Sequence, residues 1–271
     1  MVVLLFWLSA WLAPQATSDY PSADEFAKRV RQAARLDFEI QERFAYVEVR
    51  RDVKISKLGK VTVGPLRTFE VFPSDRPGGT YKRLIAVDGT PLTAAERARR
   101  DAEHERDLRR EAERRATESS EQRAHRIEQA DAERRHRNAI MDDVVAVYAP
   151  TFVGYETIDG QRVLVVDLAP REHARVTTRE GRWMKQCAGR VWVDAADYQI
   201  VKMEMQMFDD VAIGWGIVGR LHKGSRLRFV RTRFEDAWVP AEVTYAAKGR
   251  TLLFRPFEFS VTTTFANYKR R

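Results

Sequence analysis

Residues 201–207 read VKMEMQM, and this stretch decides the class of the fold. Its apolar side chains alternate with polar ones, which is the period of two that a strand with one buried and one solvated face requires. Residues 257–262 (FEFSVT) alternate in the same way. The apolar members of the first stretch are Val201, Met203, Met205 and Met207.

The same signals extend outward along the chain. Asp88-Gly89 and Asp159-Gly160 are two-residue turns of the kind that joins antiparallel strands. No helical crossover is expected after residue 149, which argues against a parallel α/β enzyme and for an antiparallel meander. Before the first strand, Ser22 and Glu25 form a capping box that predicts a helix over residues 23–36. Strands are expected at residues 44–50, 61–63, 68–72, 81–87, 155–158, 163–168, 191–194, 199–207, 225–234 and 238–247.

Residues 93–148 differ in kind from the rest. Residues 93–138 contain 13 arginines and 12 acidic residues but no lysine. Such a segment is helical through i,i+4 Glu–Arg pairs, each worth about 0.2–0.5 kcal/mol. Thr93 is expected to cap it, residues 117–120 to break it into a helical hairpin, and only residues 140–148 to dock on the core. The segment is either a helical excursion exposed to solvent or a coiled-coil contact with a partner or a second copy.

The N-terminus predicts export. Residues 2–13 form an apolar run of 12, shorter than the roughly 20 residues of a membrane-spanning helix. Pro14 and small residues follow, as in a secretory signal peptide, although no basic residue precedes the run. The alternative is a buried strand or helix. We therefore expect a periplasmic protein, soluble or held by an uncleaved N-terminal segment.

Positive charge is concentrated in residues 171–271, which carry 19 basic and 11 acidic side chains of a chain with net charge +8. Such a basic excess favours an anionic partner, here a lipid surface, because export argues against nucleic acid. Charges that prevent edge-to-edge pairing of strands are the alternative. Without a bulge near Val230, Arg226 and Arg228 before that residue face the opposite way from Arg231 and Arg233 after it. The set is Arg220, Lys223, Arg226, Arg228, Arg231 and Arg233.

Motifs for catalysis are lacking: the sequence has no phosphate-binding glycine loop, HExxH, CxxC or GxSxG. Cys187 is the only cysteine, which excludes an intramolecular disulfide. The nearby Arg182 and Lys185 could lower its pKa, but the favoured interpretation is a buried small residue or an idle surface thiol. The five histidines, His104 among them, are expected on the surface. No metal, no cofactor and no enzymatic activity are predicted.

A family resemblance rests on a series of short motifs in residues 150–268. The motifs are, in order along the chain, YETIDG (155–160), VLVVDLAP (163–170), GRVWVD (189–194), the strand 199–207, WVPAE (238–242) and FANY (265–268). With these motifs in this order, the sequence resembles outer-membrane lipoprotein-sorting proteins of the LolA/LolB-like superfamily. This chain departs from the group by its charged helical segment and its basic C-terminal part.

The resemblance implies an α+β fold in which a curved antiparallel β-sheet, an incomplete barrel, packs on helices and encloses an apolar cavity for acyl chains. With it, four parts are expected: 1–18, a signal peptide or N-terminal anchor; 19–92, the first half of the sheet with its helix; 93–148, a long charged helical insertion; and 149–271, the second half of the sheet.

The predicted function is that of a periplasmic lipid- or lipoprotein-binding protein, with a lipid or an acylated protein as partner. Methionines suit irregular apolar ligands, although ordinary core packing also explains them. The alternative function is a structural or protein-interaction module that acts through residues 93–138. The predicted apolar lining is Val201, Met203, Met205, Met207, Trp192, Phe257 and Phe259.

Overall fold

The computed structural model describes residues 19–41, 43–56, 58, 60–73, 80–213, 219–251 and 255–270. The predicted leader, the predicted loop at residues 76–79 and Gly59 lie outside these residues. The helices are α1 (Ala23–Gln41), α2 (Ala94–Ala116), α3 (Ser120–Val147) and α4 (Arg179–Met184). The strands are β1 (Phe44–Ile55), β2 (Val61–Pro73), β3 (Thr80–Val87), β4 (Thr90–Pro91), β5 (Tyr148–Ile158), β6 (Gln161–Pro170), β7 (Cys187–Asp194), β8 (Ile200–Met207), β9 (Val211–Ile213), β10 (Gly219–Leu221), β11 (Arg226–Phe234), β12 (Ala237–Thr251) and β13 (Pro256–Arg270).

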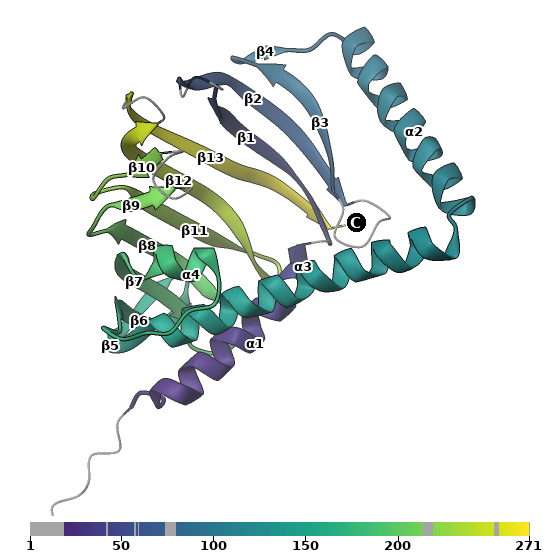
Figure 1. The fold of residues 1–271 in the computed structure, drawn as a ribbon. Helices are drawn as coiled ribbons and strands as arrows, with labels where there is room; N and C mark the ends of the chain where they lie inside the picture. The colour runs from purple at the N-terminus through teal and green to yellow at the C-terminus, as the bar shows by residue number, and fades with distance from the viewer. Residues whose placement is uncertain are drawn as a thin grey trace, which may run out of the picture.

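All of these strands belong to one antiparallel sheet. Its order is β4-β3-β2-β1-β13-β12-β11-β8-β7-β6-β5, with β10 beside β12 and β9 beside β10. The last strand of the chain therefore pairs with the first and joins the two halves of the sheet. The sheet curves strongly but is not closed, since β4 and β5 stand at opposite ends of the order (Figure 1). The predicted α+β fold with a curved antiparallel sheet is confirmed.

The predicted turns are present with the expected backbone. Asp88 and Gly89 have φ of 48° and 78°, and Asp159 and Gly160 have φ of 49° and 74°. Positive φ at both central residues is what a two-residue hairpin turn needs, and the twist of such a turn matches that of the flanking strands. The β5–β6 register, from Ile158 opposite Gln161 onward, follows from this turn.

Helix α1 packs across one face of the sheet, which we call the inner face. The Glu25 amide donates to Ser22 Oγ at 3.2 Å, as the predicted cap requires, and the helix runs to Gln41 rather than ending at residue 36. Phe26, only 6% exposed, anchors it, and burial of such a side chain contributes about 1.5–3 kcal/mol. Its buried partners on β6 and β7 are Leu164, Val166, Val191 and Val193.

The charged segment forms two helices, as expected, with the predicted break at residues 117–119. Thr93 and Ser119 each form a complete capping box, with Glu96 and Gln122 respectively. The predicted hairpin is wrong: α2 and α3, both described throughout, diverge from their junction instead of packing side by side (Figure 1). Each helix has its own N-cap, so the chain restarts in a new direction there. That the segment is an insertion stays a prediction.

Helix α2 has no buried residue and is anchored to β3 through one short set of contacts. Asp101 accepts hydrogen bonds from the Tyr81 hydroxyl at 2.7 Å and from Arg83 Nε at 3.0 Å. The His104 ring stacks on Tyr81, with 3.7 Å between ring centroids. The expectation of a solvated His104 is therefore wrong, because β3 supplies an aromatic partner one helical turn from Asp101.

The last turns of α3 dock on the core, as the apolar residues there predicted. Val147 is fully buried, and Asp143 is 2% exposed. Asp143 accepts hydrogen bonds from the backbone amides and hydroxyls of Thr177 and Thr178, at 2.6–3.3 Å, just before α4. Within the residues that the structure describes, no helix is long and apolar enough to cross a bilayer.

Candidate functional site

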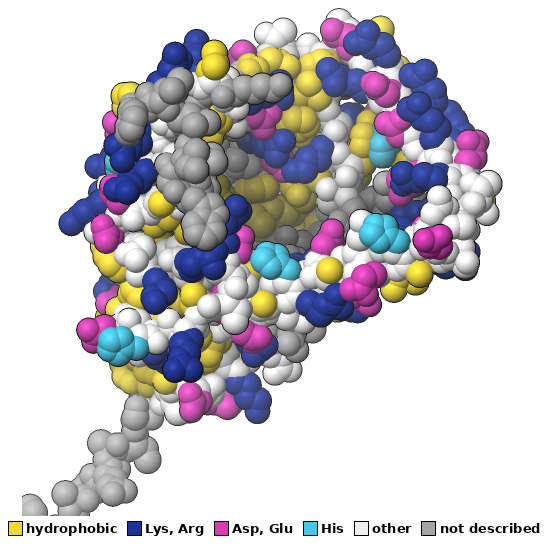
Figure 2. All heavy atoms as spheres, viewed as in Figure 1, with side chains coloured by type: hydrophobic (Ala, Val, Ile, Leu, Met, Phe, Trp, Pro, Cys, Tyr) yellow, Lys and Arg dark blue, Asp and Glu magenta, His cyan; other side chains and the backbone are white. Residues whose placement is uncertain are grey.

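Among the residues that the structure describes, α1 covers the inner face from β6 and β7 to the Arg231 end of β11. Beyond it, apolar side chains on β8, β11, β12 and β13 face the same way, because Met205, Leu227, Tyr245 and Val261 are opposite one another in successive strand pairs. Tyr245 is 49% exposed, and its neighbours in this row are partly exposed. Figure 2 shows the molecule hollowed between the sheet and the helices, with hydrophobic side chains on the wall. We define the inner hollow by Met205, Leu227, Tyr245, Val261, Phe257 and Phe259.

Two glycines let large side chains lie flat on the floor of this hollow. Gly249 is opposite Phe257 on β13, and a Cβ at Gly249 would lie 2.8 Å from the Phe257 ring. Gly189 is opposite Met205, and a Cβ there would lie 2.7 Å from the Met205 sulfur. Phe257 in turn stacks on Phe259, with 5.9 Å between centroids. The hollow is thus lined by broad apolar surfaces rather than by side-chain tips.

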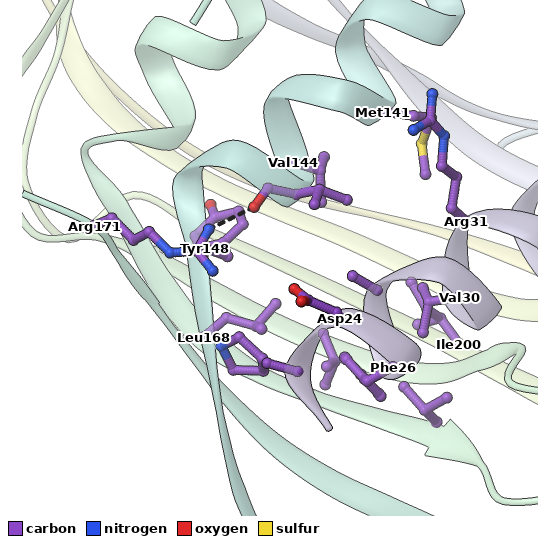
Figure 3. A pocket seen from close by; sticks show the side chains of 16 residues that line it. Asp24, Phe26, Val30, Arg31, Met141, Val144, Tyr148, Leu168, Arg171 and Ile200 are labelled. Carbon is purple, nitrogen blue, oxygen red and sulfur yellow. Dashed lines mark hydrogen bonds between the residues drawn. The ribbon is translucent and has the colours of Figure 1, made fainter. Parts of the chain in front are cut away.

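A small apolar cavity lies where α1, α3 and the sheet meet (Figure 3). Its volume is about 100 Å³, and Phe26, Val30, Val144, Leu168 and Ile200 are among its lining residues. Pockets that take drug-sized ligands measure roughly 300–1,000 Å³. This cavity is too small for an acyl chain, and the open groove of about 1020 Å³ on the outer face is lined by charged side chains such as Arg190, Glu204 and Arg228. The apolar inner hollow is therefore the candidate site.

One wall of the hollow, on β1–β3, is ionic. Glu48 is 2% exposed and receives Lys82 Nζ at 2.6 Å and Arg50 Nη1 at 3.2 Å. Asp52 pairs with Arg67 at 2.6 Å. A buried carboxylate is tolerated only when it is paired in this way. Burial, together with the charge of Glu48, raises the pKa of the nearby Tyr46 hydroxyl.

The predicted apolar lining is divided between the two faces. Met203, Met205, Met207, Phe257 and Phe259 face inward by strand pairing. Trp192 and Val201 instead belong to a buried cluster on the outer face with Val163, Val165 and Trp238. Trp192 faces outward because it alternates with the inward Val191 and Val193. Val201 does so because of a β-bulge: Trp192 is opposite Lys202 and Val193 is opposite Ile200, which leaves Val201 as the extra residue.

The predicted basic set does not form one surface. Arg226 and Arg228 lie on the outer face, whereas Arg231 is 7% exposed and lies under α1 beside Val30 and Ala33. A bulge does occur at Val230, but the extra residue is in β12, so the alternation of β11 continues through it. Arg233 lies over the Trp238 ring at 5.6 Å, and Arg220 pairs with Asp210 at 3.8 Å. Lys223 is exposed in the turn before β11.

Across the outer face, charges alternate in sign from strand to strand. Arg190 binds Asp167 through two hydrogen bonds of 2.6 and 2.9 Å, and Arg228 pairs with Glu204 at 3.4 Å and with Glu242. The Arg190 guanidinium holds the pKa of the Asp167 carboxyl below its ordinary value. Arg228, one of the predicted contacts to an anionic surface, therefore already has two carboxylate partners.

Two kinds of reactive group remain among the described residues: side chains that could hold a metal ion, and the Cys187 thiol. No three His, Cys, Asp or Glu side chains there converge as a metal site. Burial of the Cys187 thiol raises its pKa, so the alternative in which Arg182 and Lys185 lower it does not hold.

Several residues of the hollow were missed at the level of sequence. Leu227 and Tyr245 lie in basic and mixed strands whose inward positions become evident only when the registers with β8 and β13 are known. Val261 was visible in the alternation of residues 257–262 but was not included. Glu48 and Lys82 carried no signal, because they are far apart in sequence and meet across β2.

The architecture defined here is an open antiparallel sheet that curves around helices on its inner face. No protein-family model matches the chain. No curated protein matches its sequence either.

Solved structures do match it. One is a LolA superfamily protein of Nitrosomonas europaea, 10% identical with a TM-score of 0.27, covering 93% of this chain and 94% of that chain. Another is a domain assigned to outer-membrane lipoprotein sorting in Vibrio parahaemolyticus, 11% identical with a TM-score of 0.28, covering 90% and 93%. A third is the MucA/MucB complex of Pseudomonas aeruginosa, 10% identical with a TM-score of 0.25, covering 93% and 99%. The likeness to the LolA superfamily expected from the sequence is thus found again, as a likeness of fold alone, and the function is argued below from this chain's own residues.

Proposed function

We propose that this chain is an exported, non-catalytic protein that binds a lipid or an acylated protein in the inner hollow. The observation that carries the proposal is the uncovered apolar row on β8, β11, β12 and β13, with Tyr245 49% exposed. A contiguous apolar patch of this kind on a soluble domain is typical of a binding site. Each buried CH₂ of an acyl chain would contribute about 0.8 kcal/mol.

The experiment compares two adjacent positions on β13. Val261 faces the hollow, whereas Thr262 faces outward, is exposed and pairs with Thr244 on the outer face. Val261→Asp places a charge in the apolar row and is expected to weaken uptake of a fluorescent fatty-acid probe at least tenfold. Thr262→Asp, the matched control, is expected to bind as the unchanged protein does. Circular dichroism of both variants checks that they fold.

Organic extraction of the purified protein supplies the second readout. Copurifying lipid is expected from the unchanged protein and less of it from Val261→Asp. Absence of lipid together with absence of probe uptake would refute the proposal.

A second candidate function is capture of a protein partner by α2 and α3. The observation that favours it is that α2 buries no residue of its own, although β3 holds it in place. Replacing residues 96–138 by a short linker should abolish partner capture and leave probe uptake intact. If probe uptake is lost as well, the helices belong to the hollow rather than to a separate interface.

A further inference from the structure

An open cavity of about 490 Å³ lies between α2 and the inner face of β2 and β3, where it includes Arg67 and Lys82 of the ionic wall of the hollow. Four residues of α2 line it, Arg100, Glu103, His104 and Asp107, at the i, i+3, i+4 and i+7 positions that form one helical face. This face is held toward the sheet by the Asp101–Tyr81 hydrogen bond and the His104–Tyr81 stack. A polar helix face is thus fixed over a space instead of being packed against the sheet.

The two walls of this cavity differ in charge. The sheet wall presents the cations Arg67 and Lys82, about one third exposed and positioned by Asp52 and Glu48 behind them. The helix wall presents the carboxylates of Glu103 and Asp107, the latter also paired with Arg110, beside Arg100. A molecule that fills the space therefore meets the paired cations of the sheet on one side and the carboxylates of the helix on the other.

Apolar side chains adjoin the charged ones. Phe69 and Leu84 line the same cavity. A ligand with a charged end and an apolar end would satisfy both kinds of surface. A free soluble headgroup would leave the apolar part uncovered.

We propose that the cavity between α2 and β2–β3 binds a zwitterionic phosphoethanolamine headgroup of a lipid, with the phosphate toward Arg67 and Lys82 and the ammonium toward Glu103 and Asp107. Guanidinium and ammonium groups donate charge-assisted hydrogen bonds to phosphate oxygens, and carboxylates accept them from an ammonium. The assignment rests on the proposed lipid-binding function and specifies which lipid it prefers.

The test uses four soluble ligands and the full chain. Dihexanoyl phosphatidylethanolamine, phosphatidylglycerol and phosphatidylcholine share the phosphate and the chains but differ in the ammonium, and O-phosphoethanolamine has no chains. Calorimetric titration is expected to give a dissociation constant at least about tenfold lower for the ethanolamine lipid than for the glycerol lipid, as one added charge-assisted hydrogen bond predicts. The choline lipid, which cannot donate that bond, should resemble the glycerol lipid.

Variants on α2 test the ammonium side without disturbing the sheet. The double variant Glu103→Gln, Asp107→Asn should bring the ethanolamine lipid to the affinity of the glycerol lipid. Glu105→Gln is the matched control, since that exposed residue pairs with Arg109 on another face of the same helix. Arg67→Gln should weaken all three phospholipids alike.

The outcomes distinguish failure of the headgroup assignment from failure of the proposed lipid-binding function. Equal affinity for all three lipids, with fatty-acid probe uptake intact, overturns the headgroup assignment and leaves the proposed function standing. Loss of every lipid and of probe uptake overturns both. Binding of O-phosphoethanolamine as tight as that of the ethanolamine lipid overturns the assignment to a lipid.

Discussion

Asp143 is a buried carboxylate that orders the chain before α4. Although burial opposes ionisation, the hydrogen bonds from Thr178 and Thr177 keep the pKa of Asp143 below its ordinary value. Four hydrogen-bond donors, two backbone amides and two hydroxyls, converge on its two oxygens. This single side chain thereby connects α3 to the N-terminus of α4.

Asp143→Asn should lower the free energy of unfolding by about 2–3 kcal/mol, because the amide nitrogen would face amide donors. The measurement is urea denaturation. Asp142→Asn is the control: its side chain is 54% exposed and pairs with Arg31, so a loss below about 1 kcal/mol is expected.

The same comparison has a defined pH dependence. Since the folded pKa lies below that of the unfolded chain, about 3.9, the contribution of Asp143 is complete above that pH and is lost as pH falls through the folded value. The difference between the unchanged protein and Asp143→Asn should therefore shrink in acid below about pH 4. A difference that stays constant down to pH 2 would contradict this account.

At the scale of elements, α2 is a long helix held by one cluster of side chains. Asp101→Ala removes the acceptor of the Tyr81 and Arg83 hydrogen bonds. Amide hydrogen exchange in residues 94–116 should then accelerate at least tenfold, while the melting temperature changes by less than about 2 °C, because α2 buries no residue. Glu105→Ala, on the same helix, should leave the exchange rates unchanged. Slow exchange in both variants would mean that α2 is held elsewhere.

Most elements could be predicted from local patterns. Capping at Ser22 and Thr93, the Asp-Gly turns and the alternation of residues 203–207 and of β13 each depend on neighbouring residues, and each was found where expected. The direction of α3 after Ser119 could not be predicted, because it depends on docking of the distant Val147 end on the core. The bulge at Val201 was likewise invisible, since an extra residue shows only against a partner strand.

At the scale of the whole molecule, the β1–β13 junction joins the two halves of the sheet. Tyr268 on β13 lies 5.3 Å from Tyr46 and 5.9 Å from Phe234 between ring centroids, and its hydroxyl donates to Pro240 O at 2.6 Å. Burial of this phenol raises its pKa. No local pattern predicts that β1 and β13 pair. The shape of the hollow depends on this junction, so it could not be predicted from local sequence patterns.

Tyr268→Ala should lower the free energy of unfolding by about 3 kcal/mol, since it removes a packed ring and its hydrogen bond at the junction. Lys269→Ala, the exposed neighbour, should change it by less than about 0.5 kcal/mol. Urea titration followed by tryptophan fluorescence measures both. Equal stability of the two variants would show that the halves of the sheet hold together without the junction.

Gly189 and Gly249 have a consequence for how this protein can diverge. At both positions the first carbon of any side chain would collide with neighbouring backbone carbonyls, at 2.0 and 2.2 Å, as well as with the ring or sulfur above. Relatives that bind a ligand of the same width should therefore vary at the exposed edges of the sheet but keep glycine at these two sites. A related sequence with a larger residue at either site would be expected to have a shallower binding surface and a narrower ligand.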